Sequence, residues 1–424
     1  MTSAARSLAV FPAGSLGEYN LPPELSVVLA RGEGAAVWDT DGRRFTDFTM
    51  GWGSVILGHA HPAVVEAVRL QVTLGSNFAY VSAPALELAE ELTRAVACAE
   101  RVRFCASGTE AAAYAVRLAR AYTRRPKIVK FEGAYHGANE IGVVSLFPSG
   151  RVPFPGAEPT SAGLSAGAVA DVLVAPYNDL SAVEAIVKAH ADEVAAIIVE
   201  PLHRCTPPLP GFLAGLRALT AATDSLLLFD ETVTGFRLAY GGAQAYYGVR
   251  PDLATFGKAM GGGCPLGAIV GRGDVMDLVR EDRLGAAGYV WFASSLGGNP
   301  VSSAAAVATL ARLRGPGTYE RLFGLGEALR SGLRAVLAEA GVTAQVQGDG
   351  PLAAVVFTGQ PVTDYRSTLG ADRRRARAFL LGLFRRGIFL NPMSTKLYLS
   401  LAHTEADIAA LLDAARAALR DPVA

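Results

Sequence analysis

The sequence predicts an α/β protein with a mostly parallel seven-stranded sheet, covered by helices on both faces, and a separate smaller α+β unit. Three observations lead to this prediction. Between about residues 85 and 315, short apolar runs alternate with Ala-rich amphipathic segments, which is typical of parallel strands connected by helices. A Gly315-Pro316-Gly317 break then ends the alternation. With 424 residues, 51% of them hydrophobic, the chain can bury the large core that this fold requires.

The expected elements follow in chain order. Two β-type runs, 36–39 and 44–48, flank an Asp41-Gly42 pair, which predicts a hairpin that joins one of the two units. Residues 148–168 are rich in Gly, Pro, Ser and Ala and are predicted to form a long mobile loop. The large unit is expected to hold strands at 102–106, 127–131, 171–175, 195–200, 226–230, 253–256 and 267–271, with helices between them that include 110–123, 181–190 and 211–223.

The smaller unit is predicted from the segment that follows the glycine–proline break. A helix over 318–340, strand-like segments near 344–347 and 353–357, and two further helices indicate an α+β arrangement. We therefore expect three regions in the chain: an N-terminal segment at 1–60 that joins the small domain, a large domain at 61–315, and a C-terminal small domain at 316–424.

Composition narrows the class of partner. The 39 Lys and Arg residues balance 39 Asp and Glu residues, so the electrostatic drive toward nucleic acid or an anionic membrane surface is missing. No run approaches the roughly 18 apolar residues that span a bilayer, and no secretory leader is recognisable, so we expect a cytoplasmic protein. The four cysteines have no C-x-x-C spacing, and neither a zinc site nor a disulfide framework is expected. A small-molecule partner is predicted.

Residues 107–110 (Ser107-Gly108-Thr109-Glu110) come directly after a predicted strand and open an Ala-rich helix. Exposed N–H groups and the positive end of the helix dipole at this place suit a phosphate, and Gly108 allows the backbone to approach it. The alternative is that Ser107 and Glu110 form an ordinary capping box.

Two further spots follow strands of the same predicted sheet. Tyr135, beside His136, could lie against a heteroaromatic ring, although a tyrosine in this setting is more often a core residue. Glu200 ends another strand, and the simpler interpretation is a turn carboxylate. Ligands of open α/β sheets bind at the carboxyl ends of the strands, which is where all three side chains are placed.

Asp230 and Lys258 complete the set. An aspartate at the end of the apolar run 226–229 is costly to bury as an ion without a partner, so we expect it to face a cation. Lys258 lies among glycines next to buried strands, a setting that lowers the pKa of an amine and makes it nucleophilic, although a solvated loop lysine is the alternative. A phosphorylated pyridine aldehyde requires four groups for its binding and chemistry: an anion-binding site, an aromatic ring that stacks on it, a buried acid and a nucleophilic amine.

The chain resembles the class III aminotransferases of fold type I, which use pyridoxal 5'-phosphate, and it is most similar to glutamate-1-semialdehyde aminomutase-like members. Asp230 and Lys258 have the separation of that family. The resemblance extends almost from end to end and rests on Arg31-Gly32-Glu33-Gly34-Ala35, Gly58-His59-Ala60-His61-Pro62, Ser107 to Glu110, Tyr135-His136-Gly137, Tyr177-Asn178-Asp179-Leu180, Asp230-Glu231, Thr234-Gly235-Phe236-Arg237, Gly257-Lys258, Gly298-Asn299-Pro300 and Ser400-Leu401-Ala402-His403-Thr404.

The resemblance implies a role for each cofactor-binding residue. Lys258 forms the internal Schiff base and later moves the proton between substrate and cofactor carbons. Asp230 pairs with the pyridinium nitrogen and keeps the ring an electron sink. Tyr135 stacks on the ring with His136 beside it, and Glu200 belongs to the same site. Ser107, Gly108 and Thr109 hold the phosphate.

The resemblance also implies a homodimer with shared active sites, because a residue at the position of Ser295 reaches the phosphate of the neighbouring subunit in this family. Trp52 matches a substrate-pocket tryptophan of the aminomutases, with a buried core Trp as the alternative. His203 and Arg204 are further substrate-binding candidates, Arg204 as a carboxylate partner, against the simpler interpretation of a surface arginine. No metal is assigned, since His59 and His61 belong to a turn that the family has.

The sequence departs from the aminomutases at substrate-side positions. Their Ser-Pro-Val-Arg-Ala-Phe stretch is replaced by residues 14–20, their Glu-Pro-x-x-Gly-Asn by residues 200–204, and their Gln-Phe-Glu by residues 393–396. The cofactor-binding residues match those of the aminomutases, whereas the substrate-side residues differ. This difference favours an intermolecular transaminase acting on an amino donor and a keto or aldehyde acceptor. Glutamate-1-semialdehyde 2,1-aminomutase is the alternative. A catalytically silent protein of this fold is disfavoured, because Lys258 and Asp230 are both present.

Overall fold

The computed structural model describes residues 2–17, 20–393 and 396–422. Two of the substrate-side departures, at 14–20 and 393–396, fall partly outside these ranges. Packing divides the chain into two compact units, and each has its own hydrophobic core, with one sheet in unit 2 and two in unit 1. Unit 1 comprises Met1–Pro62, Pro316–Val362 and Gly370–Ala424, and unit 2 comprises Ala63–Gly315 and Thr363–Leu369.

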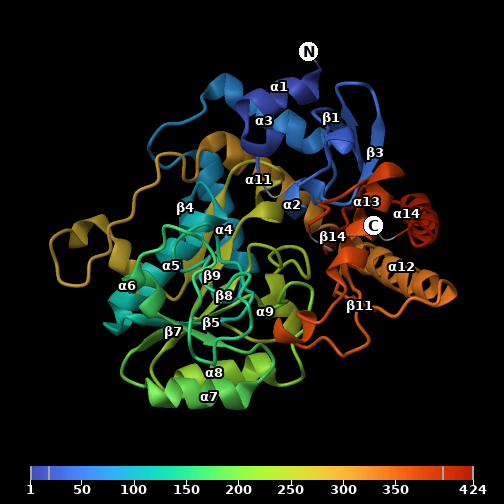
Figure 1. The fold of residues 1–424 in the computed structure, drawn as a ribbon. Coiled ribbons are helices and arrows are strands. Elements are labelled where there is room, and N and C mark those ends of the chain that lie inside the picture. The colour runs from blue at the N-terminus through green and yellow to red at the C-terminus, as the bar shows by residue number, and fades with distance from the viewer. Residues whose placement is uncertain (1, 18–19, 394–395, 423–424) are drawn as a thin grey trace. The chain divides into compact units, whose positions relative to one another are not determined.

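Unit 2 is built on a seven-stranded sheet (Figure 1). Its strands are β4 (Arg101–Cys105), β5 (Lys127–Phe131), β6 (Val172–Ala175), β7 (Val194–Val199), β8 (Leu226–Asp230), β9 (Leu253–Phe256) and β10 (Gly267–Gly271). They are ordered β4-β10-β9-β8-β7-β5-β6 across the sheet. β10 runs antiparallel to both β4 and β9, and the other neighbours are parallel. This confirms the mostly parallel sheet that the sequence predicts.

Helices cover both faces of this sheet, because alternate residues of its strands are buried on opposite sides. Side chains of α5 (Gly108–Thr123) pack on one face, and α7 (Leu180–Ala189) and α8 (Phe212–Ala222), which lie side by side in Figure 1, contact β6, β7 and β8. The remaining helices of this unit are α3 (Pro62–Leu74), α4 (Ala83–Ala95), α6 (Ala166–Ala170), α9 (Gly242–Tyr247), α10 (Gly273–Met276) and α11 (Pro300–Leu313).

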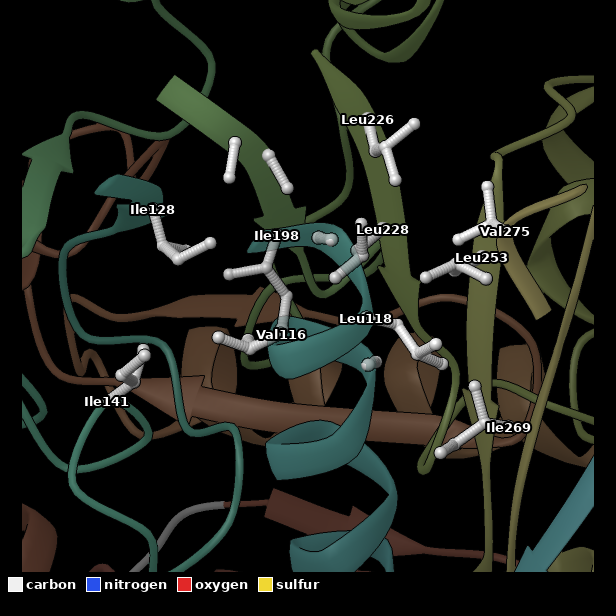
Figure 2. Packing of buried hydrophobic residues seen from close by; sticks show 14 of the residues in the cluster. Val116, Leu118, Ile128, Ile141, Ile198, Leu226, Leu228, Leu253, Ile269 and Val275 are labelled. Atoms are coloured by element: carbon white, nitrogen blue, oxygen red, sulfur yellow. The ribbon is translucent and has the colours of Figure 1, made fainter. Parts of the chain in front are cut away.

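The core beneath α5 joins the strands into one rigid layer. Figure 2 shows Ile128 of β5, Ile198 of β7 and Leu228 of β8 in the same cluster as Val116 and Leu118 of α5. Each of these five side chains is at most 5% exposed. Burying a side chain of this size contributes about 1.5–3 kcal/mol, so the positions of the strand ends are strongly fixed.

Unit 1 contains two smaller sheets. One has the order β1-β2-β3-β13 and the other β11-β12-β14, and α14 packs against both α12 and α13. The elements of this unit are α1 (Ser3–Val10), β1 (Leu29–Glu33), β2 (Ala36–Asp39), β3 (Arg44–Asp47), α2 (Met50–Gly53), α12 (Thr318–Glu339), β11 (Gln345–Gln347), β12 (Leu352–Val356), α13 (Arg373–Arg385), β13 (Ile388–Phe389), β14 (Lys396–Tyr398) and α14 (Glu405–Ala418).

Most predicted elements are present within one or two residues of their predicted ends, and the antiparallel hairpin of β2 and β3 is among them. The segment 148–168 is less irregular than predicted, because α6 begins at Ala166 behind an N-cap from Ser165. Strands β1, β13 and β14 were not predicted. They are two to five residues long, and β1 carries charged and glycine residues without an apolar alternation. No helix among the described residues is both long and apolar enough to cross a lipid bilayer.

Candidate active site

Parallel strands bring the predicted site residues to one edge of the unit 2 sheet. β5, β7, β8 and β9 run in the same direction, so their carboxyl ends lie on one side. Tyr135 and His136 follow β5, Glu200 follows β7, Asp230 ends β8, and Lys258 follows β9. Residues that are far apart in the sequence are therefore neighbours at this edge, as the sequence predicts for an open α/β sheet.

Asp230 is buried, with 6% of its surface exposed, and both carboxylate oxygens accept hydrogen bonds. Oδ2 accepts from Nδ1 of His136 at 2.8 Å, and Oδ1 accepts from the hydroxyls of Thr232 at 2.6 Å and Thr255 at 3.0 Å. Burial alone raises the pKa of Asp230, but the hydrogen bond and electrostatic interaction with His136, together with the hydrogen bond from Thr232, outweigh it and the pKa is lowered. The carboxylate is therefore held ionised at neutral pH.

The adjacent Glu231 differs from Asp230 in its hydrogen-bond partners and in the direction of its pKa shift. Its carboxylate accepts hydrogen bonds from the backbone N–H groups of Ala243 and Gln244 at the start of α9 and from the hydroxyl of Thr234 at 3.2 Å. Burial raises the pKa of Glu231 to about 6, despite these hydrogen bonds. Glu231 therefore holds a helix in place, while Asp230 carries the charge at the strand end.

The turn after β5 is joined to two other strand ends. His136 is fully buried and contacts Asp230, and its Nε2 atom has no hydrogen-bond partner among the described residues. The backbone N–H of Tyr135 donates to Oε1 of Glu200 at 3.0 Å. The Glu200 side chain thus fixes the turn that carries Tyr135, and Tyr135 itself is half-buried.

Residues 107–109 lie at the start of α5. Ser107 is the N-cap of this helix, since its hydroxyl accepts from the N–H of Glu110 at 3.2 Å, but the Glu110 carboxylate accepts from Ala106 and not from Ser107, so the capping box is incomplete. A Cβ atom on Gly108 would lie 2.8 Å from Cγ2 of Thr232. The hydroxyl of Thr109 accepts from the N–H of Ala138 at 3.2 Å, next to the turn that carries His136. This helix start is thus packed against the Asp230 segment.

Lys258 begins a short 3-10 turn, Lys258–Gly261, directly after β9. Its φ of 44° lies in the left-handed region, which costs a side-chain-bearing residue about 1 kcal/mol or more. A Cβ atom on the preceding Gly257 would lie 3.3 Å from Cγ2 of Thr232 and 3.8 Å from Cα of Gly108. The backbone that leads into Lys258 therefore passes close to both the start of α5 and the Asp230 segment.

The substrate-side candidates have different surroundings. His203 is buried and stacks on Tyr177 with ring centroids 4.8 Å apart, and its Nδ1 atom lies 3.9 Å from Oε2 of Glu200. Arg204 is exposed, and its Nε donates to the carbonyl of Gly133 at 2.9 Å.

Two other candidates lie elsewhere in the chain. Ser295 is exposed on the segment before α11, and its carbonyl accepts from Asn77 at 3.0 Å. Trp52 belongs to unit 1, in α2, with a φ of 58°. Substrate-binding roles for these residues stay predictions.

Neither an arginine-lined hollow nor a metal-binding cluster provides a second candidate site among the described residues. A hollow of about 360 Å³ is lined in part by Arg101, Arg103 and Arg280, but these arginines are paired with Asp277, Glu281 and Asp282, and the hollow lies at the amino end of β4, away from the strand ends described above. Within the described residues, no group of three or more His, Cys, Asp or Glu side chains is arranged to hold a metal ion.

Thr232 and Thr255, whose hydroxyls orient Asp230, were not predicted from the sequence. Thr232 lies only two residues beyond Asp230, which is a spacing typical of a side-chain turn. Thr255 is opposite Asp230 in the register between β8 and β9. That pairing could be found only once the order of the strands was known.

A model of the family described as aminotransferase class III matches residues 20–419. The chain is 44% identical over 396 residues to a glutamate-1-semialdehyde 2,1-aminomutase of Roseiflexus castenholzii, which covers 92% of this chain and 89% of the relative. A second such aminomutase, of Thermomicrobium roseum, is 43% identical over 402 residues and covers 94% and 92% of the two chains.

Solved structures agree with the sequence comparison. An ω-transaminase from Sphaerobacter thermophilus superposes with a TM-score of 0.93 at 37% identity and covers 99% of this chain and 96% of its own. A glutamate-1-semialdehyde aminomutase from Pseudomonas aeruginosa superposes with a TM-score of 0.87 at 27% identity, covering 98% and 93%. The chain belongs to the class III aminotransferase family, and it is an enzyme that depends on pyridoxal phosphate.

The residues at the strand ends fit this cofactor. The donor set offers a carboxylate held ionised at Asp230, a helix start with N–H groups that have no partner within the helix, and the amine of Lys258. The Nε2 atom of His136 is buried without a hydrogen-bond partner among the described residues, and a buried polar atom of this kind can be satisfied by a polar ligand. These are the kinds of group that bind a pyridine nitrogen, a phosphate and an aldehyde.

Proposed function

We propose that the enzyme is an intermolecular transaminase, which moves an amino group between an amino acid or amine and a keto or aldehyde acceptor. Lys258 is the residue to which the cofactor is attached and the base of the reaction, and Asp230 is the partner of the ring nitrogen. Tyr135 and His136 pack at the ring, with Glu200 supporting their turn, and Ser107, Gly108 and Thr109 receive the phosphate.

When bound, pyridoxal phosphate supplies an aldehyde that condenses with amines and a ring that withdraws electrons from the neighbouring carbon. Asp230 keeps its negative charge because hydrogen bonds from His136 and Thr232 stabilise it, so its carboxylate can hold a proton on the ring nitrogen. Once displaced from the cofactor by the substrate amine, the Nζ amine of Lys258 would take the proton from the amine-bearing substrate carbon and deliver it to the aldehyde carbon of the cofactor. The start of α5 supplies N–H donors that orient the phosphate.

The position of Arg204 supports an amino acid as one of the substrates. Residues 203–206 form a tight turn, in which the backbone groups of His203 and Thr206 are paired in both directions, and Arg204 has a φ of 52°. The Arg204 N–H donates to Oε2 of Glu200, and its side chain donates to Gly133, two residues before Tyr135. An exposed guanidinium beside the Tyr135 turn is suited to a carboxylate.

The test is a panel of amino donors and keto acids, each supplied to the purified holoenzyme and followed by the appearance of the new amino acid. Transfer between two different molecules supports the proposal. Borohydride reduction and peptide mapping should place the pyridoxyl group on Lys258, and Lys258→Ala should lose this label and reduce kcat by at least about a thousandfold, as expected for removal of a covalent base. A label on another lysine would contradict the assignment.

The second candidate is glutamate-1-semialdehyde 2,1-aminomutase, which the 44% identity to a curated aminomutase favours. An aminomutase moves the amine within one molecule and needs no second keto partner. Incubation of the enzyme with glutamate semialdehyde alone separates the two functions. Repeated turnover to 5-aminolevulinate without a second substrate would establish the aminomutase in place of the transaminase.

We further propose a homodimer in which Ser295 completes the phosphate site of the partner subunit. Unit 2 exposes large apolar side chains near Ser295 and near Asn77, which are joined by a hydrogen bond. Large exposed apolar side chains are typical of a protein–protein interface where they lie together. These side chains are Leu70, Val72, Leu74, Phe78, Tyr80, Val81, Trp291 and Leu296.

A further inference from the structure

Lys130 is a fully buried lysine in the strand that precedes the Tyr135 turn. It lies on β5 between Val129 and Phe131, with 0% of its surface exposed. The neighbouring Lys127 at the start of the same strand is partly exposed and lies 3.6 Å from Glu193, as expected for an ordinary lysine. A buried ammonium is expensive unless polar groups surround it.

The amine of Lys130 donates hydrogen bonds to backbone carbonyls of one short segment. Its Nζ atom lies 3.0 Å from the oxygen of Ala134, 3.3 Å from Ile141, 3.2 Å from Gly142 and 2.5 Å from Val144. Burial lowers the pKa of Lys130 to about 7, with a smaller opposing contribution from the charge of Glu200. The amine has two N–H donors when it is neutral and three when it is charged, so the four carbonyls share these donors on both sides of neutral pH.

This segment, residues 134–144, contains Tyr135 and His136. The Gly142 carbonyl that accepts from Lys130 is also 3.5 Å from the backbone N of His136, whose ring then contacts Asp230. Asn139 links two parts of the same segment from within: its side-chain NH₂ donates to the carbonyl of His136 at 2.9 Å, and its side-chain oxygen accepts from the N–H of Gly142 at 2.8 Å. The segment is therefore shaped by two polar side chains rather than by a regular element.

We propose that Lys130 is a positioning residue, which sets the conformation of residues 134–144 and thereby places Tyr135 and His136 for the cofactor. This inference rests on the proposed roles of Tyr135 and His136. It assigns to Lys130 no contact with the cofactor or substrate. Without its amine, the four buried carbonyl oxygens lose the two or three N–H donors that they share, and buried acceptors without a donor destabilise the segment that carries them.

The test compares Lys130→Met with two controls on the same strand. Lys127→Met removes a lysine outside the segment, and Ile128→Ala removes buried volume from the core cluster in Figure 2, so it lowers stability without touching the carbonyls. Backbone amides of 133–144 in the cofactor-free protein should exchange at least about tenfold faster in Lys130→Met than in either control. The dissociation constant for pyridoxal phosphate should rise by about tenfold or more, with a weaker visible circular dichroism signal from the bound cofactor.

Asn139→Ala provides a second variant should Lys130→Met fail to fold. Asn139→Ala should accelerate amide exchange and weaken cofactor binding, as expected for Lys130→Met. If both substitutions act on one segment, their effects should be non-additive in the double variant. The inference is overturned if Lys130→Met, or Asn139→Ala where the first is insoluble, matches Ile128→Ala in both measurements. A wild-type enzyme without label on Lys258 would instead overturn the proposed function, whereas the exchange measurement needs no cofactor and tests Lys130 by itself.

Discussion

At the scale of single residues, the site depends on a buried carboxylate that stays ionised. Burying the Asp230 carboxylate costs free energy, and hydrogen bonds from one imidazole and two hydroxyls offset this cost. The sequence predicts that Asp230 faces a cation, and the structure shows His136 in contact with it together with Thr232 and Thr255. The charge on Asp230 is thus a property of its surroundings as much as of its own chemistry.

Thr255→Val tests whether the Thr255 hydroxyl stabilises the charged form of Asp230. Valine has nearly the same volume, so the main change is loss of the hydroxyl that donates to Oδ1 of Asp230. A hydrogen bond to a charged group contributes about 1.5–3 kcal/mol, and we expect the pKa of Asp230 to rise and kcat to fall by about tenfold or more. Thr220→Val, a buried threonine of α8 whose hydroxyl donates to Leu216, is the control. Equal kinetics for the two variants would show that Thr255 does not act through Asp230.

His403 provides a pH-dependent prediction in unit 1. Its Nδ1 accepts from the N–H of Ser400 at 3.0 Å and its Nε2 donates to the carbonyl of Asp47 at 3.0 Å, an arrangement that requires the neutral ring. Burial lowers the pKa of His403 in the folded protein, so between that value and its unfolded value the unfolded chain binds more protons. Stability should therefore fall as pH drops below about 6.5.

This loss is measurable as the difference between the unfolding temperatures of the wild type and His403→Gln at pH 7.5 and pH 5.5. The variant lacks the titrating ring, so its unfolding temperature should decrease less. An identical decrease in both proteins would show that His403 does not contribute to the acid sensitivity.

At the scale of elements, the segment Thr363–Leu369 is packed within unit 2 although the chain on both sides of it belongs to unit 1. Arg366 forms two hydrogen bonds with the buried carboxylate of Glu132, at 2.8 and 3.1 Å, and its guanidinium lies 3.8 Å from the ring centroid of Phe154. Glu132 directly follows β5, close in sequence to Tyr135. An ion pair thus connects a C-terminal segment to the strand that leads into the site.

Arg366→Ala leaves the Glu132 carboxylate buried without this partner. Such a loss costs about 3–5 kcal/mol, so amide exchange in 363–369 should accelerate and the unfolding temperature should fall. Arg416→Ala removes an exposed arginine that pairs with Glu339 and should cost no more than about 1 kcal/mol. Replacing Glu132 by Gln in the Arg366→Ala background should recover part of the loss. Similar effects of Arg366→Ala and Arg416→Ala would argue against a buried ion pair.

At the scale of the whole molecule, the proposed homodimer makes each active site depend on two chains. Lys258→Ala and Ser295→Glu should each be nearly inactive alone, the second because its carboxylate repels the cofactor phosphate. Mixed dimers contain one site with both changes and one with neither. An equimolar mixture that is allowed to exchange subunits should therefore recover about a quarter of the wild-type activity. Subunit exchange is verified by mass spectrometry. If no activity is recovered after exchange, Lys258 and Ser295 act in the same subunit's site, or Ser295 is not part of the site.

The sequence by itself determined the main elements and singled out the candidate site residues at the strand ends. Apolar runs, helical periodicity and breaks at glycine and proline are local signals, so β5, β8 and β9 were predicted to the residue. Asp230 and Lys258 were recognisable because a charged residue after a buried strand is unusual in itself. The short strands β1, β13 and β14 were missed, because partners distant in the sequence, and not local propensity, make them strands.

Only the tertiary structure decided how these residues support one another. The pairing of Thr255 with Asp230 depends on strand order, the contact of Arg366 with Glu132 joins residues more than two hundred positions apart, and Lys130 is buried under carbonyls of an irregular segment. Side-chain environment arises from the packing of several elements at once. No local pattern of a single sequence carries that information.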